Sequence, residues 1–254
     1  MIKVRGLENG YGRYGMLCLT GLGFSLFQHK KKKLTSKTLG FSLVEMAIVL
    51  LVFGLIIGGL MGPLKTQMDR LDRKETLKEI SLIKESMVGF ALRNGRIPCP
   101  DTDNDGIEDT SGGNCANELG NVPWATLGVG RYDGWKRPFT YRVDDRFADT
   151  SDGSGCADTD VAGVSFELCS TGDISVLASQ GGAAVASNVP AVIVSHGKNW
   201  AQTAGSDEAE NQDSDADFVD KTYVIGGSND YDDIVDWLNL NNLIVKMVQA
   251  ERLP

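Results

Sequence analysis

The sequence contains little histidine: His29 and His196 are the only two in 254 residues. Any histidine-dependent catalysis beyond the first 40 residues would therefore need His196. That residue lies in the string "IVSHGKN", where adjacent Ser195 and His196 would point to opposite faces of a strand. The chain also lacks a G-x-S-x-G elbow and a glycine-rich phosphate loop. The sequence therefore predicts that the protein is not an enzyme, and that His196 and Asn199 stabilise a turn.

Basic residues are scarce in most of the chain. Of the 25 Lys and Arg residues, eight precede Phe41 together with one of the 34 acids, so 17 bases and 33 acids remain beyond it. Nucleic-acid-binding proteins usually carry a basic face, so this acidic body argues against nucleic acid as a ligand. Cations are the more natural ligands of such a surface.

One long segment is almost free of charge. From Phe41 to Leu64 every residue is apolar or small except Ser42 and Glu45. A bilayer core of about 30 Å needs about 20 apolar residues in a helix, so this segment is long enough to span it. Lysines 30–33 and 37 precede it, and the positive-inside rule then predicts a cytoplasmic N-terminus. No small-residue cleavage site of a secretory signal peptide follows the segment, so the simplest alternative is an uncleaved anchor.

A carboxylate within this apolar segment is costly unless it has a partner or a purpose. The boundary reads "KTLG" followed by "FSLVE", with Glu45 the fifth residue counted from Phe41. Bases, a Gly-Phe junction, an acid and a spanning helix together resemble the prepilin signal of the type IV pilin and type II secretion pseudopilin family. The resemblance is strongest from Lys30 to Pro63.

The resemblance implies how the chain is processed. A prepilin peptidase would cut between Gly40 and Phe41 and N-methylate Phe41, and Glu45 would neutralise the terminal amine of a neighbouring subunit. The implied partners are this peptidase, other pilin or pseudopilin subunits and an inner-membrane assembly platform. The implied location is the inner membrane of a Gram-negative bacterium, with a periplasmic head, and then a pilus or pseudopilus. A start at Met16 would shorten the leader, and both starts remain open.

The domain plan follows from these features. We expect a cleaved cytoplasmic leader (1–40), a transmembrane or filament-core helix (41–64), its amphipathic continuation (65–95) and a globular periplasmic head (96–254). The expected fold class is α+β and pilin-like, with the long helix packed on a largely antiparallel sheet.

Several segments of the head have recognisable patterns. Strand-like runs occupy 164–169, 174–178, 191–196 and 222–225, and "NVPWATLGV" and "DGWKRPFTYRV" each combine turn residues with strand residues. The second string resembles a pseudopilin segment, and we expect Trp135 and Tyr141 to pack the sheet onto the helix. An apolar pattern over 234–248 predicts a C-terminal helix.

Acidic loops and cysteines complete the prediction. Asp101, Asp103, Asp105 and Asp109 resemble the opening of a Ca²⁺ loop, but the twelfth position is Gly112, so an EF-hand is excluded. A different calcium cage and a metal-free Asx-turn loop both remain open. A second acidic cluster, Asp207 to Asp220, reads as a solvated loop or a second cation site. Four of the five cysteines follow the apolar segment, and the pairing we favour is Cys99–Cys115 and Cys156–Cys169.

The function expected from the sequence is a structural one. We predict a subunit of a type IV pilus or type II secretion pseudopilus. In a chain of 254 residues, 214 would follow the cleavage point, which is large for a major pilin, so the resemblance implies a minor pilin or pseudopilin. The competing hypotheses are a calcium-dependent adhesive or ligand-binding module on a pilin stalk, and a merely anchored envelope protein.

Overall fold

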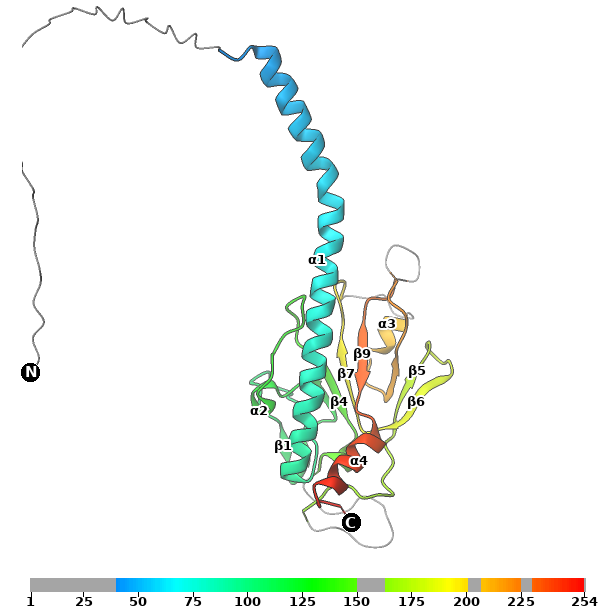
Figure 1. The fold of residues 1–254 in the computed structure, drawn as a ribbon. Coiled ribbons are helices and arrows are strands. Elements are labelled where there is room, and N and C mark those ends of the chain that lie inside the picture. Colours follow the sequence, from blue (N-terminus) through cyan, green and yellow to red (C-terminus); the bar gives the residue numbers. More distant parts are fainter. Residues whose placement is uncertain (1–39, 150–162, 201–206, 225–229, 254) are drawn as a thin grey trace, which may run out of the picture. The chain divides into compact units, whose positions relative to one another are not determined.

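A computed structural model describes residues 40–149, 163–200, 207–224 and 230–253 (Figure 1). The leader predicted over 1–40 therefore lies outside the described residues, apart from Gly40. Internal contacts divide the chain into two units, with the boundary between Phe53 and Gly54. Helix α1 (Leu43–Asn94) begins in the first unit and ends in the second, which contains all the other elements.

The second unit is built around a four-stranded sheet. Its order is β3 (Leu119–Asn121), β4 (Thr140–Val143), β7 (Ala191–Ser195) and β9 (Ile234–Trp237), and every neighbouring pair is antiparallel. Beyond it lies a three-stranded sheet of β6 (Ala184–Val189), β5 (Ile174–Leu177) and β8 (Asp217–Val219), in which only β5 and β8 run parallel. The α+β class and the largely antiparallel sheet are confirmed.

Shorter elements connect these sheets. A ribbon of β1 (Thr110–Ser111) and β2 (Asn114–Cys115) precedes β3, and the helix α2 (Trp124–Leu127) follows it. The 3₁₀ turn η1 (Asp145–Phe147) follows β4, α3 (Asp207–Glu210) precedes β8, and α4 (Leu240–Gln249) ends the fold.

The four-stranded sheet is buried on both faces. One face contributes Tyr141 and Ile193 to a large core that also contains Ile83 and Met87 of α1 and Met247 of α4. The opposite face packs against the three-stranded sheet through the side chains Val192, Val194, Val235, Ile174, Val176, Val189 and Phe218. Alternate residues of one strand therefore supply two different cores, as the pleat of a strand requires.

The amphipathic half of α1 agrees with the sequence. The helix ends at Asn94, and Gly95 follows with a φ of 75°, a left-handed value that suits glycine after a helix. Tyr141 belongs to the core against this helix, and the partly buried Trp135 packs against that core, as expected. The Tyr141 hydroxyl donates to the Pro98 carbonyl at 2.8 Å.

A close approach between a turn and α1 explains one glycine. A Cβ at position 134 would lie 2.1 Å from the carbonyl oxygen of Asp72, so only glycine fits. The Gly134 amide donates to Thr76 on the same helix, while Asp133 accepts from the amides of Trp135 and Arg137. The "DGW" string is thus a helix-docking turn.

Three strand predictions were wrong. In 164–169 the buried side chains of Val164 and Phe166 fill the core, but the backbone forms a loop whose Ser165 amide donates to the Gly95 carbonyl. In 222–225 the described residues form only an isolated bridge between Val224 and Tyr231. Trp124–Leu127, within "NVPWATLGV", is helical. In these segments the apolar residues indicated correctly that the side chains are buried, but burial alone does not require the backbone to pair as a strand.

The predicted C-terminal helix was half wrong. Ile234–Trp237 is strand β9, and the helix begins only at Leu240, where the Asn239 side chain caps it by accepting from the Asn242 amide at 3.0 Å. Ile234 and Val235 are buried in different cores on opposite faces of the sheet. A strand that is apolar on both faces lacks alternation, so its pattern merges with that of the following helix.

One predicted disulfide is confirmed. Cys99 and Cys115 are joined, with a sequence separation of 16, across the acidic loop. Cys169 is also disulfide-bonded, but its expected partner, Cys156, lies outside the described residues.

We expect Cys115→Ala to lower the free energy of unfolding by about 3 kcal/mol, because a disulfide that closes a loop of about 15 residues restricts the unfolded chain by that amount. Urea unfolding under non-reducing conditions measures the change. Cys99→Ala/Cys115→Ala should lose no more than about 1 kcal/mol beyond the single variant, because it additionally removes the packing of the buried Cys99 sulfur. An unchanged midpoint in Cys115→Ala would contradict this account of the loop.

Candidate functional site

The predicted processing and assembly residues lie together at the start of the described chain. Gly40 and Phe41 precede α1, and both are exposed, Phe41 by 74%. Ser42 caps the helix, because its hydroxyl accepts from the Glu45 amide at 3.1 Å. Glu45 therefore lies in the first turn of α1, where the helix dipole favours a negative charge.

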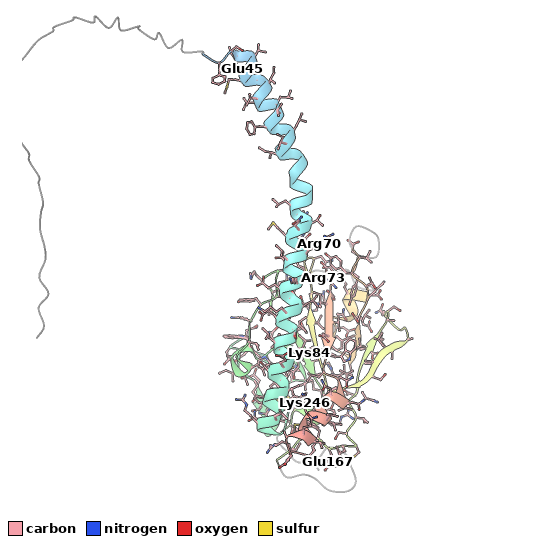
Figure 2. The ribbon with its side chains drawn as sticks, in the orientation of Figure 1. Glu45, Arg70, Arg73, Lys84, Glu167 and Lys246 are labelled. Carbon is pink, nitrogen blue, oxygen red and sulfur yellow. A yellow bond between two sulfur atoms is a disulfide. The ribbon has the colours of Figure 1, made fainter. Side chains whose placement is uncertain are left out.

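The helix that follows Glu45 is apolar on every side. It is long and apolar enough to cross a membrane, and none of that stretch is buried. Figure 2 shows these side chains projecting freely around the helix axis. Its exposed large apolar side chains up to residue 57 are Leu43, Val44, Met46, Ile48, Val49, Leu50, Leu51, Val52, Phe53, Leu55, Ile56 and Ile57. A helix that is apolar all round belongs in a membrane or in the core of an assembly.

The acidic loop after α1 has the contacts of a tight turn. Both oxygens of Asp101 accept backbone amides, from Asn104 at 2.7 Å and from Gly106 at 2.9 Å. Asp109 Oδ2 accepts from the amide and the hydroxyl of Thr102, and these bonds lower the pKa of Asp109. Asx-turn bonds of this kind order a loop without a metal.

Three of the four predicted calcium ligands lie close together in this loop. Asp101, Asp103 and Asp109 each offer an oxygen within 4.8 Å of the others, whereas Asp105 is not in the group. Asp105 instead accepts from the Ile107 amide at 2.7 Å. Calcium binding here stays a prediction.

The base of the loop is held by an ion pair that sequence reasoning missed. Arg96 donates to both oxygens of Glu108 at 2.7 Å, and Glu108 also accepts from the Cys99 amide. Both side chains are mostly buried. The two residues are 12 positions apart, which is not the three- or four-residue spacing from which an ion pair on a helix can be predicted.

The "SHGKN" string does not form a catalytic pair. Ser195 donates to Asp133 Oδ2 at 2.7 Å, whereas His196 Nε2 lies 2.8 Å from the hydroxyl of Thr140. The two side chains thus have separate partners, as expected for neighbours on a strand. Asn199 does hold a turn together, through its backbone amide and Asp232 Oδ2 at 3.2 Å.

A group of buried carboxylates lies beside this string. Glu208 of α3 and the consecutive Asp232 and Asp233 each offer an oxygen within 4.8 Å of the others, and all three residues are at least 97% buried. Burial, together with the charges of the two aspartates, raises the pKa of Glu208 to about 7. Burial likewise raises the pKa of Asp232. Sequence reasoning missed this group because 23 residues lie between Glu208 and the first of the two aspartates.

The exposed part of the second acidic cluster is a solvated loop. The Asp215 amide donates to Asp213, and the Asp217 amide donates to Asp215, which are successive Asx turns. Glu210, Asp213 and Asp215 offer oxygens within 4.8 Å of one another, but both aspartates are exposed.

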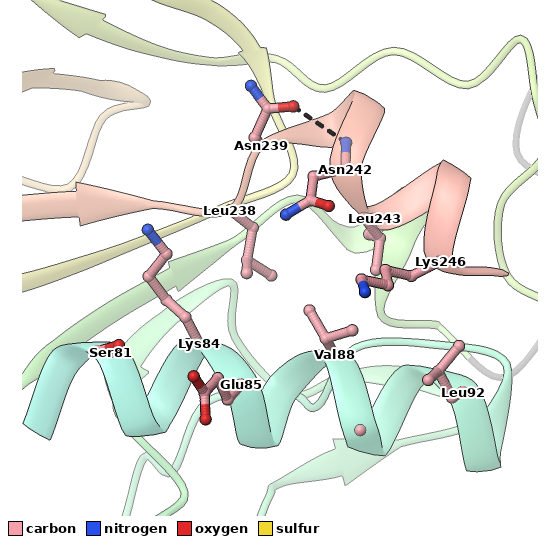
Figure 3. Close-up of a pocket in the computed structure, with 11 residues that line it drawn as sticks. Ser81, Lys84, Glu85, Val88, Leu92, Leu238, Asn239, Asn242, Leu243 and Lys246 are labelled. Atoms are coloured by element: carbon pink, nitrogen blue, oxygen red, sulfur yellow. Dashed lines mark hydrogen bonds between the residues drawn. The ribbon is translucent and has the colours of Figure 1, made fainter. Parts of the chain in front are cut away.

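A groove of about 590 Å³ lies between α1 and α4. Figure 3 shows Val88 and Leu92 on one wall and Leu238 and Leu243 on the other. Lys84 and Lys246 also line it, and Lys84 pairs with Asp236 at 2.7 Å. The groove holds apolar surface but no convergent set of reactive groups.

The comparisons with known proteins identify no relative. No family model matches the chain, no curated protein matches it, and no solved structure matches it.

We expect folding stability to depend on Glu208 through pH. Its pKa in the folded protein, about 7, lies above its ordinary value of 4.5. The folded state therefore binds the proton more tightly, and this group's contribution to stability falls as pH rises from about 4.5 to about 7. In chelator-treated buffer Glu208→Gln should flatten that part of the stability profile, measured by urea unfolding. Glu75→Gln, at an exposed position on α1, should leave the profile unchanged, and an identical fall in Glu208→Gln would refute the assignment.

Proposed function

We propose that the protein is a type IV pilin-like structural subunit, a minor pilin or pseudopilin, and not an enzyme. The observation that supports this most is the arrangement at the start of α1. An exposed Gly40–Phe41 junction precedes a capped helix with a single early acid, and an unburied apolar stretch follows. An isolated membrane anchor requires the apolar stretch but not the junction or the acid.

In this proposal the subunit is processed before it assembles. A prepilin peptidase cleaves after Gly40 on the cytoplasmic side of the inner membrane and methylates the new terminus of Phe41. The assembly platform then transfers the apolar helix from lipid to the filament, and the head remains periplasmic.

Glu45 has a defined task in this scheme. While the helix lies in lipid, an ionised or protonated carboxyl there lacks a fixed partner. Cleavage creates a terminal amine four residues upstream, and a neighbouring subunit presents the same amine. Placing the two opposite charges together costs less than burying either one alone. When the subunit leaves the lipid, pairing of Glu45 with the neighbour's terminal amine would favour one axial position of the subunit relative to that neighbour.

The buried polar residues of the head support a structural role over catalysis. Asp133 orders the turn that docks on α1, and Ser195 and His196 have separate partners. The calcium-dependent adhesive module remains the competing proposal, supported by the three carboxylates of the Asp101 loop.

Mass spectrometry of the protein from its native membrane should find N-methylated Phe41 as the first residue. The mature chain would lack residues 1–40. The same gene expressed in cells without a prepilin peptidase should yield an unmethylated chain that retains the leader. An N-terminus other than methylated Phe41 in the native membrane would overturn the proposal.

Glu45→Ala should insert into the membrane normally but enter filaments at least about tenfold less, because an unpaired amine would remain in the apolar core. Immunoblots of sheared filaments against membrane fractions give the ratio. Glu75→Ala is the matched control: it removes an exposed acid of α1 whose pair with Lys136 spans 3.5 Å, and it should assemble normally. Normal assembly of Glu45→Ala would exclude the assembly role.

A further inference from the structure

The carboxylates of Glu208, Asp232 and Asp233 form a cluster that the proposed function does not use. Glu208 is fully buried, and Asp232 and Asp233 are each 3% exposed. They come from α3 and from the segment just before β9, and their oxygens lie within 4.8 Å of one another. Carboxylates are almost never buried together unless they are paired or bind a cation.

Protein hydrogen bonds satisfy only part of this cluster. Asp232 Oδ2 accepts from the amides of Lys198 and Asn199, and Asp233 Oδ2 accepts from Asn211 Nδ2 at 2.8 Å. Their other oxygens, Asp232 Oδ1 and Asp233 Oδ1, are buried and accept no hydrogen bond from any described residue. Two acceptors therefore face the interior without a donor.

His196 supplies a separate observation that points to a ligand. It is 4% exposed, and its Nδ1 makes no hydrogen bond within the described part of the chain. Nδ1 lies 3.7 Å from Asp233 Oδ2, while Nε2 lies 2.8 Å from the Thr140 hydroxyl. When Nε2–H donates to Thr140, Nδ1 carries the lone pair, and the carboxylate beside it is that of Asp233. A metal-ligating histidine is normally oriented in this way, by a hydrogen bond at its other nitrogen.

The basic side chains on adjoining segments are engaged elsewhere. Lys198 pairs with Asp69, and Lys221 pairs with Asp207, each at 2.6 Å. Arg137 donates to the carbonyls of residues 197 and 198. Within the described residues, no Lys or Arg forms an ion pair with the three carboxylates.

We propose that Glu208, Asp232, Asp233 and His196 bind a divalent metal ion through mixed oxygen and nitrogen ligands. Two ligands about 2.1 Å from one ion can lie at most about 4.2 Å apart, and the 3.7 Å between His196 Nδ1 and Asp233 Oδ2 is within that limit. His196 lies outside the group of three carboxylates whose oxygens are within 4.8 Å of one another, so the ion has to draw the imidazole and the carboxylates closer together when it binds. Imidazole together with carboxylates is a donor set for Zn²⁺ or Mn²⁺, whereas Ca²⁺ and Mg²⁺ prefer oxygen alone. The ion offsets two of the three negative charges and joins α3, the end of β7 and the start of β9.

The test titrates the full-length protein, purified in detergent and treated with chelator, with ZnCl₂, MnCl₂ or CaCl₂. We expect one Zn²⁺ or Mn²⁺ ion per chain by elemental analysis and a rise in the midpoint of thermal unfolding that chelator reverses. This measurement on the unaltered protein does not depend on whether any variant folds. Failure of Zn²⁺ and Mn²⁺ to bind or shift the midpoint at about millimolar concentration would overturn the proposal.

Variants identify the ligands. Asp233→Asn and His196→Gln should each weaken Zn²⁺ binding at least about tenfold. Asp213→Asn, in the exposed acidic loop, is the matched control and should bind as the unaltered protein does. Binding that survives both ligand variants, or that belongs to Ca²⁺ alone and ignores His196→Gln, would refute the mixed-ligand site. Because none of these residues belongs to the apolar helix, the result is separate from that of the Glu45 experiment.

Discussion

The second unit depends on the contact between the stripe of α1 that contains Ile80, Ile83, Met87 and Ala91 and one face of the four-stranded sheet. All four side chains are fully buried. Burial of each large one contributes about 1.5–3 kcal/mol, so this seam contributes strongly to the stability of the second unit. The turn held by Asp133, with Gly134 beside Asp72, allows the chain to approach the same helix closely. Upstream, the same helix is equally apolar but is buried by nothing within the described chain.

The acidic composition has a structural consequence inside the second unit. Many carboxylates accept backbone amides and act as turn-forming groups: Asp101, Asp105, Asp133, Asp144 and Asp232 all do so. Each bond replaces water at a buried or half-buried amide that a strand or helix does not use. An excess of acids thus need not mean a charged ligand surface. In a protein with short strands and long connecting loops, such carboxylates also provide hydrogen-bond acceptors for the backbone amides of the loops.

How far the sequence predicted the structure depended on the range of the interaction. The end of α1, the strands at 174–177 and 191–195, and the loop disulfide were predicted, because local period, breakers or loop closure encode them. The strand from Ile234 to Trp237 was not predicted, because an edge strand with two buried faces lacks the alternation of apolar and polar residues that marks strands. The Arg96–Glu108 pair and the carboxylates around Asp232 are brought together only by the fold. The Gly40, Phe41 and Glu45 arrangement was readable in advance because all of it is local.

The two ends of the second unit meet in one core: Ile83 and Met87 of α1 share it with Leu243 and Met247 of α4. The intervening chain must be closed as a loop of more than a hundred residues before these contacts form, which costs entropy and slows folding. β9, the last strand among the described residues, forms one edge of the described sheet, where it pairs with β7. In a chain that emerges from its N-terminus onward, the core over the apolar stripe of α1 therefore stays incomplete until β9 and α4 have emerged. That interval is when the helix most needs protection from other apolar surfaces.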